Sequence, residues 1–130
     1  MQERIIPETI QSFILEKIDS VAELEGLLIL RTNPAEKWTS HKLAERLYVD
    51  EQRTAELLTN LCTKGLVTVQ GDEKVREYSY LPESPDLAAM VDELAYFYSK
   101  HIVPVTNLIH FRATHRVQQF ADAFKLRKDD

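Results

Sequence analysis

Seven polar side chains between Ser40 and Arg76 have the types and spacing that suit contacts to nucleic acid. Gln52 and Asn60 carry amides, which pair a donor with an acceptor and suit the edge of an adenine base. Arg53 suits guanine or a phosphate, because its guanidinium can donate two parallel hydrogen bonds. The remaining four are candidates for phosphate contacts: Ser40, Lys42, Lys74 and Arg76. For each of the seven, the alternative is an ordinary solvated side chain.

Side chains that could perform catalysis or hold a metal ion show no matching pattern. Cys62 falls in an apolar stripe, so we expect a small buried residue rather than a nucleophile. The histidines lack the i, i+4 spacing of a helical zinc pair, and the chain has no Cys-x-x-Cys. Phosphate-binding glycine loops and the Gly-x-Ser-x-Gly elbow are missing too. We therefore expect no enzyme, no catalytic residues, no metal site and no cofactor.

Two consecutive helices are expected to position the polar side chains. Thr39 and Asp50 are good N-caps for helices over 40–47 and 51–64, since each side chain can accept a hydrogen bond from an unpaired N–H of the first turn. Gly65 suits the left-handed residue that ends the second helix. Only a few residues separate the helices, which is typical of a helix-turn-helix.

A two-stranded hairpin is expected after these helices. The strands span 67–70 and 75–80, around a turn centred near Gly71 and Asp72. Apolar and polar residues alternate in the first strand, which is the pattern of a half-buried strand. Another short strand is expected at 37–39, before the first of the two helices. Strand, helix, turn, helix and hairpin is the order of a winged helix-turn-helix.

Three short motifs in this segment match a known kind of domain. They are Leu43-Ala44-x-x-Leu47 before the turn, Leu58-x-x-Leu61 after it, and Lys64-Gly65-Leu66-Val67 at the start of the hairpin. The segment, roughly a third of the chain, resembles the winged-helix domains of small bacterial transcription regulators, the MarR-like and PadR-like families among them. The resemblance implies a dimer that binds double-stranded DNA, with the second helix in the major groove and the wing along the backbone.

The remaining segments are predicted to be helical. One helix is expected over 7–18 and another over 21–30, where Ser20 and Glu23 match a capping box. A last helix is expected over 114–124. The ending from Phe120 to Asp129 resembles that of a group of uncharacterised bacterial winged-helix proteins, which implies no activity. The predicted fold is mainly α with a small β-wing: a winged-helix core with an N-terminal helix and long C-terminal helices.

A long helix starting at Pro85 has an apolar stripe with two possible partners. Pro104 is expected either to kink this helix near Lys100 or to split it in two. The stripe can fold back on the first helix of the chain, or it can pair with a second copy. We expect a homodimer, in which 1–82 form the N-terminal helix and winged-helix domain and 83–130 form a C-terminal helical dimerisation extension. The expected interface residues are Leu87, Val91, Leu94, Tyr98 and Val105.

The distribution of charge works against strong DNA binding. The chain of 130 residues has a formal net charge of -5, and residues 41–82 hold six basic side chains against seven acidic ones. Neutralisation of phosphates supplies much of the affinity of a protein for DNA, so a single copy of this nearly neutral segment is expected to have low affinity for DNA. Residues 100–128 are strongly basic, and they could touch nucleic acid, an acidic partner or the acidic N-terminal helices of this chain.

Composition is that of an ordinary globular protein. A single cysteine excludes an intramolecular disulfide, and the N-terminus lacks the pattern of a signal peptide, so we expect a cytoplasmic protein. The favoured function is a DNA-binding transcription regulator. An adaptor that uses the winged helix to bind a protein, and a sensor with a small-molecule pocket between the long helix and the core, remain open alternatives.

Overall fold

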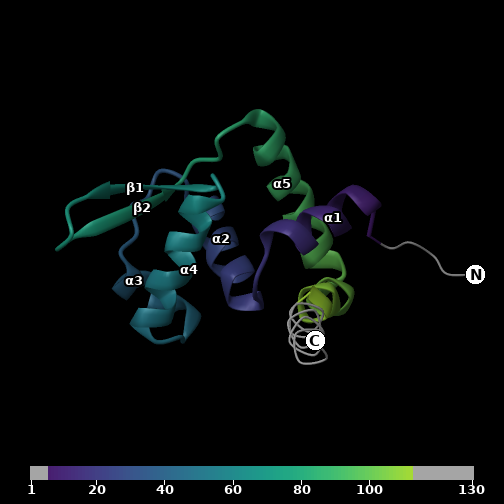
Figure 1. Cartoon of the computed structure of the whole chain (residues 1–130), viewed down its shortest axis with the longest axis horizontal. Helices are drawn as coiled ribbons and strands as arrows, with labels where there is room; N and C mark the ends of the chain where they lie inside the picture. The colour runs from purple at the N-terminus through teal and green to yellow at the C-terminus, as the bar shows by residue number, and fades with distance from the viewer. Residues whose placement is uncertain (1–5, 113–130) are drawn as a thin grey trace, which may run out of the picture.

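Helices form most of the structure, and a two-stranded hairpin is added to them (Figure 1). The computed structural model describes residues 6–112, so the helix expected over 114–124 lies outside the described residues. The elements are α1 (Glu8–Lys17), α2 (Val21–Thr32), α3 (Ser40–Leu47), α4 (Glu51–Thr63), β1 (Val67–Gly71), β2 (Arg76–Tyr80), α5 (Pro85–Lys100) and a further helix over 102–112. The predicted fold class is confirmed.

The residues from 21 to 82, here called the head, form the winged helix. α3 and α4 begin at the predicted caps: the Thr39 hydroxyl accepts from the backbone N–H of Lys42 at 3.1 Å, and the Asp50 carboxylate accepts from that of Arg53 at 2.8 Å. In Figure 1, α2 lies beside and partly behind α4, and the two helices approach each other closely at Gly26. A Cβ on Gly26 would lie 3.1 Å from the Leu57 side chain, so that side chain would have to shift slightly to admit a larger residue there.

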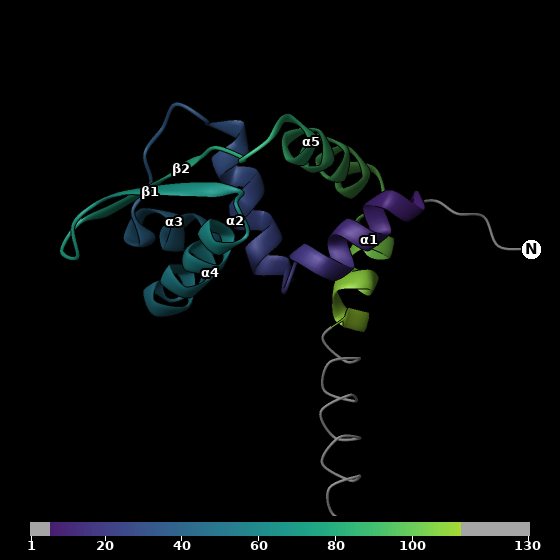
Figure 2. The same cartoon turned by 45° about the horizontal axis from the view of Figure 1, so that its top comes forward.

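The hairpin starts at the end of α4, where Gly65 has the expected left-handed backbone with φ of 78°. The two strands are antiparallel, with Val67 opposite Tyr80 and Gly71 opposite Arg76. The short strand expected at 37–39 is present as a single bridge between Trp38 and Tyr78. The hairpin extends past α3 as a wing (Figure 2).

The half-buried pattern expected for the first strand holds only near the base of the wing. Val67 is 4% exposed, whereas Val69 is 44% exposed and Val75 is 59% exposed. The wing projects beyond the helices, so apolar side chains near its tip have no core to enter. The alternating pattern correctly predicted a strand, but the burial that it predicted for Val69 is wrong.

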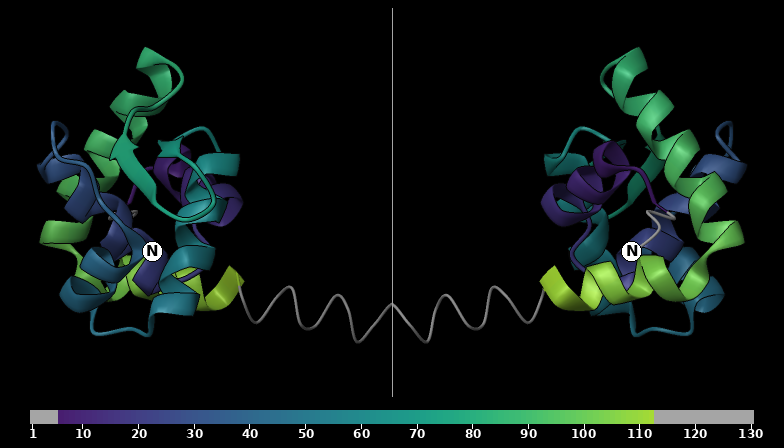
Figure 3. Two further views of the ribbon diagram at one scale, coloured as in Figure 1. Left: turned by 90° about the vertical axis from the view of Figure 1, so that its left-hand side faces the viewer. Right: turned by 90° about the vertical axis from the view of Figure 1, so that its right-hand side faces the viewer.

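α5 folds back on the N-terminal helix α1, which is one of the two partners that its apolar stripe allowed. Pro104 splits the predicted long helix: α5 ends at Lys100, and a second helix covers 102–112 after a turn at His101 (Figure 3). The proline then lies in the first turn of that second helix, where no intrahelical partner for an N–H is lost. We call residues 85–112 the C-terminal arm.

Three of the five residues expected in a dimer interface lie in the core of the single chain. Val91, Leu94 and Val105 are fully buried within it, and they pack in one continuous apolar cluster with residues of α1 and α2. Leu87 and Tyr98 are only partly buried. The three buried side chains therefore stabilise the chain itself, and in this structure they have almost no exposed surface for a second copy to contact.

The arm is also bonded to the head through α2. The Tyr98 hydroxyl donates to the Glu25 carboxylate at 2.5 Å, and the Arg31 guanidinium donates to Asp92 at 2.9 Å. Among the described residues, no helix is long and apolar enough to cross a membrane.

Candidate nucleic-acid interface

α4 buries one side and leaves the opposite side uncovered by the described chain. Thr54, Leu58 and Leu61 face the core with no exposed surface. Their spacing leaves the polar residues on the other side of the helix. Those that are exposed are Glu51, Gln52, Arg53, Glu56, Thr59 and Asn60. All three predicted base-contacting residues are therefore accessible on the second helix of the helix-turn-helix.

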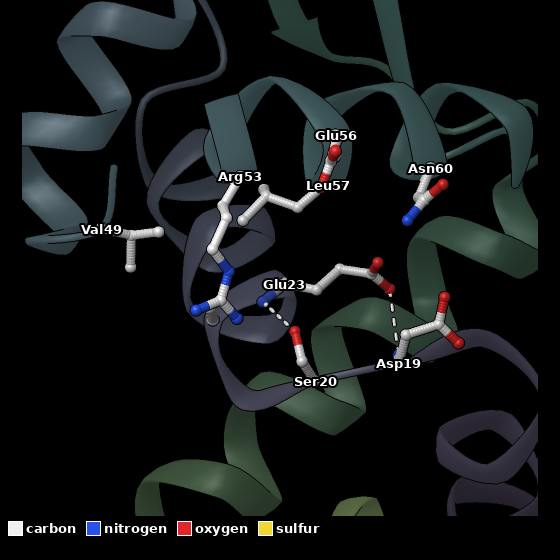
Figure 4. Close-up of a pocket in the computed structure, with 9 residues that line it drawn as sticks. Asp19, Ser20, Glu23, Val49, Arg53, Glu56, Leu57 and Asn60 are labelled. Atoms are coloured by element: carbon white, nitrogen blue, oxygen red, sulfur yellow. Dashed lines mark hydrogen bonds between the residues drawn. The ribbon is translucent and has the colours of Figure 1, made fainter. Parts of the chain in front are cut away.

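The three predicted base-contacting residues point in two directions. Gln52 and Asn60 line a shallow groove of 380 Å³ along the outer side of α4, together with Thr59. Arg53 and Asn60 also border a smaller cavity of 130 Å³ between α4 and the start of α2. In Figure 4 the Arg53 side chain extends toward Ser20 rather than straight out from the helix. Arg53 would have to change rotamer to reach the same groove as Gln52.

Ser40 and Lys42, the predicted phosphate contacts at the start of α3, have local partners or partial burial. Ser40 is the first residue of α3 and is partly buried. The Lys42 ammonium forms an ion pair with Glu36 and lies 4.5 Å from the centroid of the Trp38 ring. Its charge is thus partly neutralised inside the head, and a phosphate would have to compete with Glu36.

The wing carries the other two predicted phosphate contacts at its tip. Lys74 and Arg76 are both exposed. Asp72 shapes the turn, because its carboxylate accepts from the backbone N–H groups of Val75 at 3.0 Å and Lys74 at 2.9 Å. These two hydrogen bonds, that from Val75 first, hold the pKa of Asp72 below its ordinary value. The turn is therefore ordered locally and presents both basic side chains to solvent.

A cluster of charges between α4 and the corner joining α1 to α2 was not predicted from the sequence. The Lys64 ammonium lies 3.1 Å from the Asp19 carboxylate and 2.5 Å from that of Glu23, which is 1% exposed. Arg112 from the C-terminal arm forms an ion pair with the same Asp19. The sequence places Glu23 in the capping box at the start of α2 and Lys64 in the motif at the start of the hairpin, and neither motif indicates that the two side chains pair.

Burial and charge act in opposite directions on the two carboxyl groups of this cluster. Burial raises the pKa of Glu23, although its hydrogen bond from Lys64 opposes the rise. Burial alone would also raise the pKa of Asp19, but hydrogen bonds and positive charge from Lys64 and Arg112 outweigh it and keep that pKa below its usual value. Asp19 thus stays ionised between two cations.

The side chains that could do covalent or metal chemistry stay apart. In the described part of the chain, no group of three or more His, Cys, Asp or Glu side chains could hold a metal ion. Cys62 is only partly buried rather than buried as expected, and burial raises the pKa of its thiol, which disfavours the thiolate. A surface groove of 620 Å³ runs along α1 as far as Met90 of α5, away from the helix-turn-helix.

Several solved structures share this fold, among them HlyU of Vibrio cholerae, MepR of S. aureus and MarR of E. coli. E. coli MarR, in a mutant form, is similar over 98% of this chain and 98% of its own, with a TM-score of 0.53 and 16% identity. The S. aureus MepR–DNA complex matches over 94% of this chain and 90% of its own, with a TM-score of 0.54 and 15% identity. Reduced HlyU from Vibrio cholerae matches over 69% of this chain and 90% of its own, with a TM-score of 0.50 and 20% identity. No family model and no curated protein matches the sequence.

Proposed function

We propose that this protein is a DNA-binding transcription regulator that acts as a homodimer. The observation that carries the proposal is the uncovered outer side of α4, with Gln52 and Asn60 in one groove, on a helix-turn-helix that is followed by an exposed wing. Amide side chains at this place suit base edges, and Lys74 and Arg76 suit phosphate. The MepR–DNA complex, whose fold this chain shares, supports the same role for the fold.

Dimerisation is proposed through side chains of the arm that are exposed in the described part of the chain. Four apolar side chains there are more than half exposed, and apolar side chains that gather on one surface favour association. They are Tyr96, Ile102, Val103 and Phe111. Leu87 and Tyr98, which are partly buried, border the same helices and belong to the proposed interface.

Fluorescence anisotropy with labelled duplexes tests the proposal. At low salt the full chain should bind random and genomic duplexes weakly, and a subset of genomic fragments should bind much more tightly. Affinity should fall steeply as salt rises, because bound phosphates release counterions. No binding to any duplex at low salt would overturn the regulator function.

One observation favours a second candidate, the protein-binding adaptor. Lys42 and Lys64, two of the six basic residues of the 41–82 segment, are already paired with carboxylates. Acidic residues on α4 and the wing therefore outweigh the remaining basic ones, which suits a basic protein surface better than a phosphate backbone. An adaptor predicts no salt-dependent DNA binding, so the same anisotropy measurement separates the two functions.

A further inference from the structure

Asp19 joins two parts of the molecule that are distant in sequence. Its Oδ2 atom is 3.1 Å from the ammonium of Lys64, which directly follows α4. Its Oδ1 atom forms an ion pair with the guanidinium of Arg112, at the end of the described arm. One carboxylate therefore binds a cation from the head on one side and a cation from the arm on the other.

Burial makes this connection stiff. The side chains of Lys64, Arg112 and Asp19 are 15%, 10% and 30% exposed, and Glu23, which also pairs with Lys64, is 1% exposed. A buried charge that loses its partner is left uncompensated in a poorly polarisable environment, and that state is strongly disfavoured. Lys64, Asp19 and Arg112 consequently cannot separate as freely as the two charges of a surface ion pair.

Arg112 is held at a fixed place by more than the carboxylate. Its guanidinium also donates to the backbone carbonyl of Leu15 and, at 3.4 Å, to those of Glu16 and Ile18. These carbonyls lie at the C-terminal end of α1, where a helix leaves oxygen atoms without internal partners and favours a positive charge. The arm is thereby attached to the same corner of the chain that Lys64 holds from the head.

We propose that Lys64, Asp19 and Arg112 are positioning residues that fix the orientation of α4 relative to the C-terminal arm. α4 itself packs against α2, α3 and β1, so this ionic connection supplements the apolar core in relating it to the arm. The consequence for DNA rests on the proposed function. In a dimer held together by the arms, the orientation sets the separation of the two α4 helices, which must match major grooves about 34–36 Å apart.

A distance measurement without DNA tests the connection directly. Nitroxide labels are placed at two exposed positions, Thr59→Cys on α4 and Asn107→Cys on the arm, in a full chain with Cys62→Ser. Dilution with unlabelled chain removes distances between copies, and pulsed electron spin resonance then gives the intrachain distribution. We expect a narrow distribution that Asp19→Asn broadens or shifts. A folded Asp19→Asn chain with an unchanged distribution would overturn the proposal.

Two further variants complete the distance experiment. Glu36→Gln is the matched control, because it removes the ion pair with Lys42 inside the head and should leave the distribution unchanged. If Asp19→Asn does not fold, Lys64→Met replaces it, since that variant keeps the bonds from Arg112 to the corner. Lys64→Met must then broaden or shift the distribution, and an unchanged one would equally overturn the proposal.

A double-mutant cycle with DNA tests the consequence. The probe is a pool of random-sequence duplexes selected with the unaltered chain, and affinity is measured by anisotropy. Lys64→Met and Arg112→Met should each weaken binding by about threefold or more. The double variant should lose no more DNA affinity than the single variant that binds less tightly, because both changes break the same connection. Losses that multiply would contradict a shared connection. If the unaltered chain binds no duplex, the proposed function fails, whereas the distance measurement still decides the connection.

Discussion

At the turn between α3 and α4, Tyr48 has a left-handed backbone with φ of 58°, and its side chain is 94% exposed. A Cβ in this conformation is crowded by its own backbone, and the ring gains no packing in return. Tyr48→Gly should therefore raise the free energy of unfolding by about 0.5–1 kcal/mol, measured by urea denaturation. Tyr48→Phe, which keeps the Cβ, should change nothing. A loss of stability in the glycine variant would show that the ring makes a contact.

Arg53 and Lys74 differ in the kind of DNA contact proposed for them. If Arg53 reaches a base, Arg53→Ala should cost about 1–3 kcal/mol for a preferred duplex and little for random DNA. Lys74→Ala should weaken binding to all duplexes alike and flatten the slope of log K against log salt by about one unit. Anisotropy titrations at several salt concentrations measure both effects. Equal losses on every sequence for Arg53→Ala would assign Arg53 to phosphate instead.

Tyr98 should ionise only at strongly alkaline pH. Burial, its hydrogen bond to Glu25 and the negative charge of Glu25 raise the pKa of Tyr98 from 10.0 to about 12. A folded-state pKa above the unfolded one contributes stability that is fully present below pH 10 and is lost as the pH rises through about 12. In Tyr98→Phe, stability should be lower at neutral pH, and the difference should shrink as the pH rises from 10 toward 12.

Absorbance at 295 nm measures the ionisation directly. The difference between the titrations of the parent chain and Tyr98→Phe isolates the Tyr98 phenolate, whose appearance should be centred near pH 12. Glu25→Ala is the control, because it removes the acceptor and should bring the midpoint closer to 10.0. A Tyr98 midpoint near 10 in the parent chain would contradict the bond to Glu25.

Among the elements, α5 depends on Leu94 to stay in place. Leu94 has no exposed surface and packs in the core shared with α1. Leu94→Ala should cost about 2–5 kcal/mol of folding stability, from lost burial and a residual cavity. Urea denaturation measures the loss, and Glu93→Ala, an exposed neighbour, should stay within about 0.5 kcal/mol. A change in dimerisation with unchanged stability would instead return Leu94 to the interface.

The sequence predicts elements well where a local interaction determines them. Thr39, Asp50 and Gly65 mark helix ends through bonds that span a few residues, and all three do so in the structure. The partner of an apolar stripe is a different matter, because period and hydrophobicity are the same for an intrachain and an interchain contact. The sequence could therefore not show that Leu94 is buried within the single chain.

The same limit applies to the candidate site. The outward side of α4 follows from helical spacing, so the exposure of Gln52 and Asn60 could be predicted. The pairing of Lys64 with Asp19 spans 45 residues, and that of Arg112 with Asp19 spans 93, so no local pattern reports either. The Arg53 side chain lies beside the start of α2, which is distant in sequence, so its direction could not be predicted either.

For the molecule as a whole, self-association should depend on exposed side chains of the arm rather than on its buried stripe. Val103 is 65% exposed, so Val103→Asp should leave the fold intact and weaken a dimer. Sedimentation velocity at micromolar concentration should show a dimer for the parent chain. A dimer stable at that concentration is expected to bury well over ~1,000 Å² of surface in total. Val75→Asp on the wing is the control. A monomeric parent chain would exclude the proposed assembly.

Trp38 gives the molecule an internal optical probe. It is the one tryptophan of the chain, 1% exposed, and it lies where the wing meets α3. Its emission therefore reports on the head alone, whereas circular dichroism sums the helices of head and arm. Denaturation curves that coincide for the two signals would show that head and arm unfold together, and curves that separate would show them unfolding in steps. The chain thus reveals its own cooperativity without any attached label.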